Sequence, residues 1–156
     1  MQGDPEVIDV LNDVLSAELT AINQYYAHYK MCENWGYKRA AHKKREEALE
    51  EMEHADHVIE RILYLEGIPN MQRLFPVKVG EDVIEQHKVD LELEREAIQR
   101  LNAGIGLCIQ KGDSGTRELL ESILKDEESA VDWLEGQLHI VNEIGREHYL
   151  AQQMHD

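Results

Sequence analysis

Proline and phenylalanine are scarce in this chain, which has three prolines and one phenylalanine among 156 residues. Glutamate, leucine and alanine are abundant instead, a composition that favours helices over sheets. Cysteine is also rare. Cys32 and Cys108 lie far apart and lack the C-x-x-C spacing of a zinc or redox pair, so we expect two reduced, packed thiols in a cytoplasmic protein.

Basic residues and long apolar runs are lacking as well. The chain has 16 Lys and Arg against 32 Asp and Glu, a net charge of −16. This balance argues against nucleic acid or an anionic membrane as a partner and suits a protein that attracts cations. No stretch approaches the roughly 18 apolar residues of a membrane span, and residues 1–7 lack the basic and apolar regions of a signal peptide. We expect neither secretion nor membrane insertion.

Apolar residues recur at threes and fours through four long segments and one short segment, within what we expect to be a single domain covering 1–156. Helices are predicted at about 5–34, 38–66, 81–111, 115–143 and 146–154. Short turns join the first two and the last two long helices into antiparallel hairpins, while the long stretch between the hairpins can cross the bundle. The predicted fold class is all-α, a four-helix bundle with a long central crossover and a short C-terminal fifth helix.

The two halves carry the same spacing of acidic residues. Glu18 precedes Glu51 by the same number of residues as Glu94 precedes Glu127. Glu51 opens a Glu-x-x-His motif, whose Glu and His at i and i+3 share one helix face and can bind a single ion. In the first half the histidine is His54. In the second half, alanine stands at the matching position, 130.

A single mid-helix glutamate is usually solvated, but apolar residues flank Glu18, Glu94 and Glu127. Four carboxylates buried at one level repel one another, and a pair of divalent ions would relieve the repulsion. Carboxylates with imidazole and no thiolate favour iron or manganese over zinc or copper. Tyr25 shares the face of Glu18, so it would lie near the metals or be a core tyrosine with one hydrogen bond.

Met52 is about 100° around the helix from Glu51, so we expect it at the bundle surface, where methionine usually fills an interface. The charged residues of segment 43–53 outside the motif are interpreted as a solvated face. Leu63, Tyr64 and Leu65, expected beyond the bundle core, predict a closed oligomer.

Several motifs closely resemble bacterioferritin over the whole chain: Asn23-Gln24-Tyr25, Asn34-Trp35-Gly36, Glu51-Met52-x-His54-Ala55-Asp56, Asp126-Glu127-Glu128 and Asp132-Trp133-Leu134-Glu135. The resemblance implies a ferritin-like bundle that assembles as a homo-oligomer, a hollow 24-mer with a ferric mineral inside. It also implies a di-iron ferroxidase centre in each bundle, haem b at subunit dimers, and a ferredoxin-type electron donor for iron release.

The resemblance also assigns roles to residues. Glu18, Glu51 and His54 would serve the first iron, and Glu51 and Glu127 would bridge. The second iron would take Glu94 and a histidine that is Ala130 here. Met52 would bind haem together with its copy from a second subunit. By the same resemblance, Glu46 and Glu50 would be carboxylates that face the cavity and bind iron. An iron entry pore would be lined by Asn34, Glu66 and Asp132. Trp133 would relay electrons, with a core tryptophan as the alternative.

The sequence therefore predicts an iron-storage and detoxification protein with ferroxidase activity. The alternative is a haem-bearing structural subunit whose ferroxidase site is impaired by Ala130. Such a subunit would form a hetero-oligomer with a catalytically complete one. A rubrerythrin-like peroxidase is disfavoured because no cysteine-rich module is present. A DNA-protecting miniature ferritin is disfavoured because those proteins place their ligands between subunits.

Overall fold

The computed structural model describes residues 1–156 and is all-helical. Its elements are α1 (Pro5–Trp35), α2 (Lys38–Tyr64), α3 (Val83–Lys111), α4 (Ser114–Ile144) and α5 (Arg146–Gln153). This confirms the predicted all-α bundle of four long helices with a short C-terminal helix. None of the helices combines the length and apolarity needed to cross a bilayer.

Aspartates cap the first, third and fourth helices, because their side chains accept hydrogen bonds from backbone amides of the first turn. Asp82 accepts from the Glu85 amide at 2.8 Å, so α3 begins at Val83 rather than near 81. The second helix ends at Tyr64, two residues before the predicted end, because Glu66 adopts a left-handed φ of 63°.

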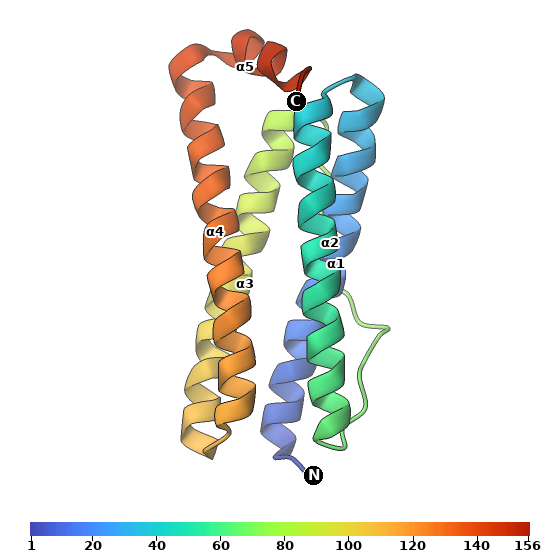
Figure 1. The fold of residues 1–156 in the computed structure, drawn as a ribbon, viewed down its shortest axis with the longest axis vertical. Coiled ribbons are helices and arrows are strands. Elements are labelled where there is room, and N and C mark those ends of the chain that lie inside the picture. The colour runs from blue at the N-terminus through green and yellow to red at the C-terminus, as the bar shows by residue number, and fades with distance from the viewer.

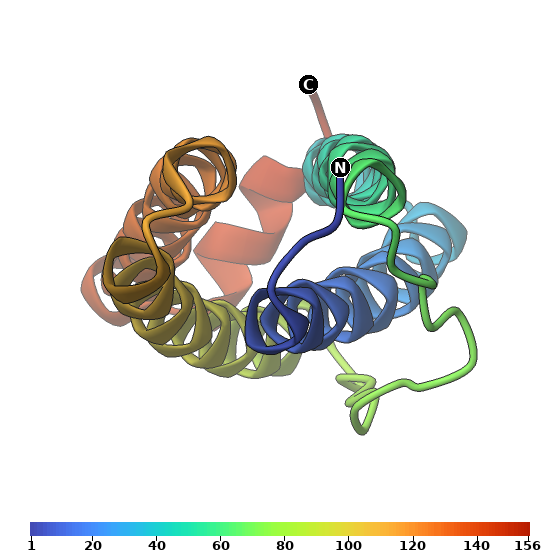
Figure 2. The same ribbon diagram turned by 90° about the horizontal axis from the view of Figure 1, so that it is seen from below.

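The four long helices form two antiparallel hairpins, α1 with α2 and α3 with α4 (Figure 1). The crossover, residues 65–82, runs along the outside of the first hairpin, away from α4 (Figures 1 and 2). The short α5 lies across one end of the bundle (Figure 1). This topology makes the two halves of the chain contribute one hairpin each to a shared interior.

A stripe of polar residues on α1 holds the crossover in place. Backbone amides of the extended crossover donate to side chains of α1 at every fourth or eighth position, which lie on one helix face. The pairs are Asn70 to Asn12 at 2.8 Å, Phe75 to Thr20 at 2.9 Å, Lys78 to Gln24 at 3.1 Å and Gly80 to His28 at 2.9 Å. These bonds replace the ladder partners that a lone extended segment lacks.

The apolar core is divided along the bundle axis. The largest cluster includes Leu11, Leu65, Leu101 and Leu120 from four parts of the chain. A smaller cluster near α5 includes Cys32 and Tyr149. The expectation that Leu65 lies outside the core is wrong: it is 1% exposed and its carbonyl accepts a 3.0 Å bond from the Gly3 amide.

Replacing Gln24 tests the polar stripe. Gln24 donates a hydrogen bond to Asp90 at 2.9 Å and accepts one from the Lys78 amide. Gln24→Leu therefore removes one hydrogen bond from each of these partners. We expect a loss of about 2 kcal/mol in the free energy of unfolding. Denaturant unfolding of the metal-free protein measures this loss. The control is Gln99→Leu, the same change at an exposed position of α3. Equal stability of the two variants would contradict the role of the stripe.

Candidate metal centre

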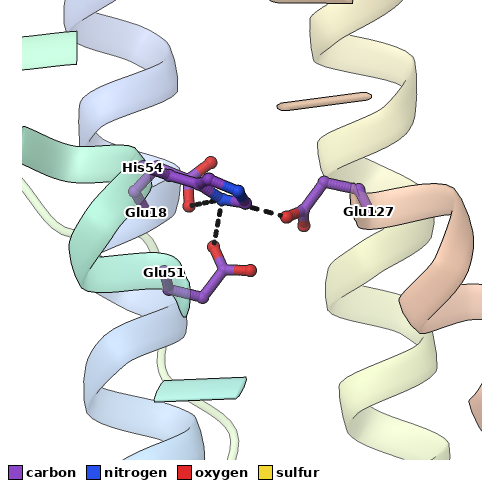
Figure 3. A group of neighbouring side chains, drawn as sticks. All are labelled: Glu18, Glu51, His54 and Glu127. Atoms are coloured by element: carbon purple, nitrogen blue, oxygen red, sulfur yellow. Dashed lines mark ion pairs between the residues drawn. The ribbon is translucent and has the colours of Figure 1, made fainter. Parts of the chain in front are cut away.

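The repeated sequence motif converges in the middle of the bundle. Glu18 comes from α1, Glu51 and His54 from α2, Glu94 from α3 and Glu127 from α4. All five are buried, with between 0% and 5% of each residue exposed. Figure 3 shows four of them pointing toward one another across the space between the hairpins.

His54 stands at the centre of three carboxylates. Its Nδ1 lies 3.4 Å from Oε2 of Glu18, 3.7 Å from Oε2 of Glu51 and 3.3 Å from Oε1 of Glu127 (Figure 3). One donor atom from each of these four residues falls within 4.8 Å of the others. This arrangement offers a cation three carboxylates and one imidazole.

The other ring nitrogen of His54 is held from outside the cluster. Its Nε2 lies 2.8 Å from Oδ2 of Asp126, a half-exposed residue on α4. Ligating histidines commonly donate their second ring N–H to a carboxylate, which fixes the tautomer and leaves the first nitrogen free for metal. The role of Asp126 cannot be predicted from the sequence, because its contact with His54 depends on how α2 and α4 are aligned.

Glu94 lies beside the four-residue group and is oriented by a tyrosine. The Tyr25 hydroxyl donates to Oε1 of Glu94 at 2.8 Å, and both residues are buried. Both predictions for Tyr25 agree with the structure: it is a core tyrosine with one hydrogen bond, and that bond places it beside the candidate metal site. Glu94 also lies close enough to Glu127 for the two carboxyl groups to affect each other's ionisation.

Each of the five site residues has one buried polar atom without a hydrogen-bond partner: Oε2 of Glu18, Oε1 of Glu51, Nδ1 of His54, Oε2 of Glu94 and Oε1 of Glu127. Buried polar atoms in proteins are nearly always satisfied, and leaving one unpaired costs about 1–3 kcal/mol. Five such atoms around one space fit a site that completes its bonding with cations.

Burial and mutual repulsion disturb the ionisation of the cluster. Burial, reinforced by the Glu18 charge, raises the pKa of Glu51 well above its ordinary value. Burial and the charge of Glu51 raise the pKa of Glu127 to about 8. Burial by itself lowers the pKa of His54, but the neighbouring carboxylates of Glu127, Glu18 and Glu51 outweigh it and raise that pKa. Without metal, the cluster holds protons where a cation would otherwise bind.

A cavity of about 140 Å³ reaches this cluster. Carboxylates from all four long helices line it, and its lining also includes Phe75 and Pro76 of the crossover and the exposed Glu96. The cavity therefore connects the carboxylates with the surface beside the crossover.

The second half of the motif is incomplete in space as well as in sequence. Ala130 is buried, one turn after Glu127 on α4, and presents only a methyl group. Its exposed neighbours Glu128 and Ser129 lie on other faces of the helix. Met52, as expected, lies away from the cluster with 51% of its surface exposed.

In segment 43–53 the expected solvated face holds for Arg45, Glu46 and Glu53, which are exposed, but is wrong for two residues. Lys44 is fully buried and contacts Asp90 at 2.6 Å and His87 at 2.9 Å, while Glu47 is only 7% exposed. Burial by itself would raise the pKa of Asp90, but Lys44 and His28 outweigh it and hold that pKa at about 2.

Trp133 packs against His87, 5.4 Å between ring centroids, rather than among the site carboxylates.

Neutralising Glu127 tests whether repulsion destabilises the metal-free centre. Its pKa rises on folding from 4.5 to about 8, so its stabilising contribution is complete below pH 4.5 and is lost as the pH rises to 8. Glu127→Gln cannot ionise, so the free energy of unfolding of the metal-free variant should exceed that of wild type by about 4 kcal/mol at pH 8 and by much less at pH 5. Denaturant unfolding at both pH values measures this, with Glu128→Gln as the exposed control. A difference that does not grow with pH would contradict the assignment.

Comparison with known proteins agrees with the geometry. Residues 8–144 match the family described as the ferritin-like domain. The chain is 49% identical over 152 residues to a bacterioferritin of Mycolicibacterium paratuberculosis, covering 97% of this chain and 96% of the relative. Bacterioferritins of Streptomyces coelicolor and Brucella melitensis are 48% and 44% identical, covering 97% and 96% of this chain and 90% and 92% of theirs. The chain belongs to the ferritin-like family and, within it, to the bacterioferritins.

Proposed function

We propose that this protein stores iron and oxidises it on the way into storage. The ferritin-like domain and the bacterioferritin relatives support iron storage. The observation that carries the oxidation step is the set of five unpaired buried donor atoms contributed by all four long helices. Carboxylate oxygens with one imidazole suit ferrous and ferric iron.

In the proposed reaction, two ferrous ions each give one electron to a single oxidant molecule. Hydrogen peroxide takes these two electrons and two protons and leaves as water, whereas dioxygen leaves as hydrogen peroxide. Glu18 and His54 would bind the first iron, Glu94 the second, and Glu51 and Glu127 would bridge them. Asp126 keeps His54 Nδ1 directed inward, and Tyr25 fixes one oxygen of Glu94.

Storage requires a container, and the bacterioferritin relatives imply an oligomeric shell. We propose a 24-mer with the mineral inside, nucleated at carboxylates such as the exposed Glu46. Exposed apolar side chains on α2, including Leu63 at 57% and Tyr64 at 52%, are available for contacts between subunits. The cavity beside the crossover offers ferrous ions a route to the centre. Release would need a reductant, for which we propose a ferredoxin-type donor.

Haem b at subunit dimers belongs to the same proposal, and Met52 fits it. The side chain is half exposed on the outer face of α2, and Leu49, one turn earlier, is 47% exposed, so an apolar strip borders the thioether. Met52 from two subunits would hold the haem iron. Such a haem would supply one-electron transfer.

A second candidate function rests on Ala130. With the histidine position filled by a methyl group, the second iron lacks a nitrogen ligand. The chain would then be a haem-bearing structural subunit that depends on a catalytically complete partner in a hetero-oligomer. The number of ferrous ions that each chain of the pure homopolymer binds separates the two functions, because the impaired subunit would bind one and the ferroxidase two.

Replacing the bridging carboxylate tests the ferroxidase proposal. Glu51→Gln removes a charge shared by both irons, so we expect the fast phase of ferrous oxidation to slow at least about tenfold, the usual scale for a disturbed metal site. Stopped-flow absorbance after mixing with peroxide or dioxygen measures the phase. Glu53→Gln, on the same helix and exposed, is the control and should match wild type. If Glu51→Gln oxidises iron as fast as the control, the centre is not the site of oxidation.

Haem binding has its own test. Protein produced with haem available should show a low-spin visible spectrum, and Met52→Leu should abolish it while light scattering still detects the assembled shell. Met71→Leu is the matched control, because Met71 is also about half exposed, at 49%, but lies in the crossover. Full haem content in Met52→Leu would refute the assignment.

A further inference from the structure

The methyl group of Ala130 faces a definite part of α2. Two contacts set the antiparallel alignment of α2 and α4: His54 lies 2.8 Å from Asp126, and the Lys43 ammonium lies 5.1 Å from the Trp133 ring centroid. Ala130 lies between Asp126 and Trp133 on α4. It therefore faces the middle of the α2 segment that runs between His54 and Lys43.

Glu47 occupies the middle of that segment. It lies one turn before Glu51, so the two carboxylates share a helix face. Only 7% of Glu47 is exposed. Its Oε1 lies 3.2 Å from the Lys43 ammonium, whereas its Oε2 is buried and has no hydrogen-bond partner. The ion pair with Lys43 therefore satisfies only one of the two carboxylate oxygens of Glu47.

The α2 segment that carries Glu47 lies beside the tyrosine that orients Glu94. Tyr25, whose hydroxyl donates to Glu94 at 2.8 Å, packs in one buried cluster with Ala48, the residue that follows Glu47. Glu94 is the expected ligand of the second iron. A buried carboxylate with one oxygen left without a partner on this side of the centre is stabilised if a cation binds beside it.

We propose that Glu47 takes the place of the missing histidine, so that Glu47, Glu94 and Glu127 hold the second metal ion. This inference rests on the proposed di-iron function and specifies how this chain performs it. The second site is then built from carboxylates alone, while the first keeps His54. A carboxylate in place of a neutral imidazole adds a negative charge and selects for harder ions.

Anaerobic titration of the metal-free homopolymer with Co²⁺, a redox-stable substitute for Fe²⁺, tests the inference without reference to activity. Visible absorption reports tight binding, and the end point gives the ions bound per chain. We expect two for wild type and two for Glu53→Gln, which makes the same change in charge at an exposed position of the same helix. Glu47→Gln should lose the second ion or bind it at least about tenfold more weakly.

The double variant Glu47→Gln/Ala130→His separates ligand loss from damage to the fold. It should regain the second ion, because the histidine supplies the ligand that glutamine cannot. Two tight ions in Glu47→Gln, or one in the double variant, would overturn the role of Glu47. One ion in wild type would overturn it too and favour the impaired subunit. No tight ion in wild type would instead refute the proposed di-iron function itself.

Discussion

The interior of this bundle is organised around carboxylates that are buried without a matching number of positive charges. His54 is the only basic side chain among the five site residues, and each of the five keeps an unpaired polar atom. Such an arrangement destabilises a folded protein unless protons or cations compensate it. The raised pKa values of Glu18, Glu51, Glu94 and Glu127 follow from this single constraint.

The surrounding fold keeps the carboxylates in place despite their repulsion. Apolar packing on one side of the centre and the cluster near α5 on the other hold the two hairpins together. A second buried polar group, Lys44 with Asp90 and His87, lies in the same bundle but is paired within itself. The contrast indicates what distinguishes the candidate metal site: its negative charge is not compensated by the protein's own residues.

The sequence was sufficient to predict the helices and the convergence of the site, because helical periodicity and the repeated spacing are local properties. Glu18 and Glu127 could be identified since apolar neighbours placed them on inward faces. Burial of Lys44 and Glu47 could not be predicted, because charged residues at neighbouring positions of α2 give no sign of which faces α4 and α5 cover. The Asp126 contact and the buried Leu65 were missed for the same reason: each depends on a partner distant in sequence.

The unpaired buried carboxylates are proposed to bind metal ions inside each bundle. Anomalous scattering at the iron absorption edge, from crystals soaked anaerobically in ferrous iron, tests it most directly. The account predicts two peaks per chain, one among Glu18, Glu51 and His54 and the other beside Glu94 and Glu127. An interior with no anomalous peak, in crystals that bind iron only at surface carboxylates, would contradict it.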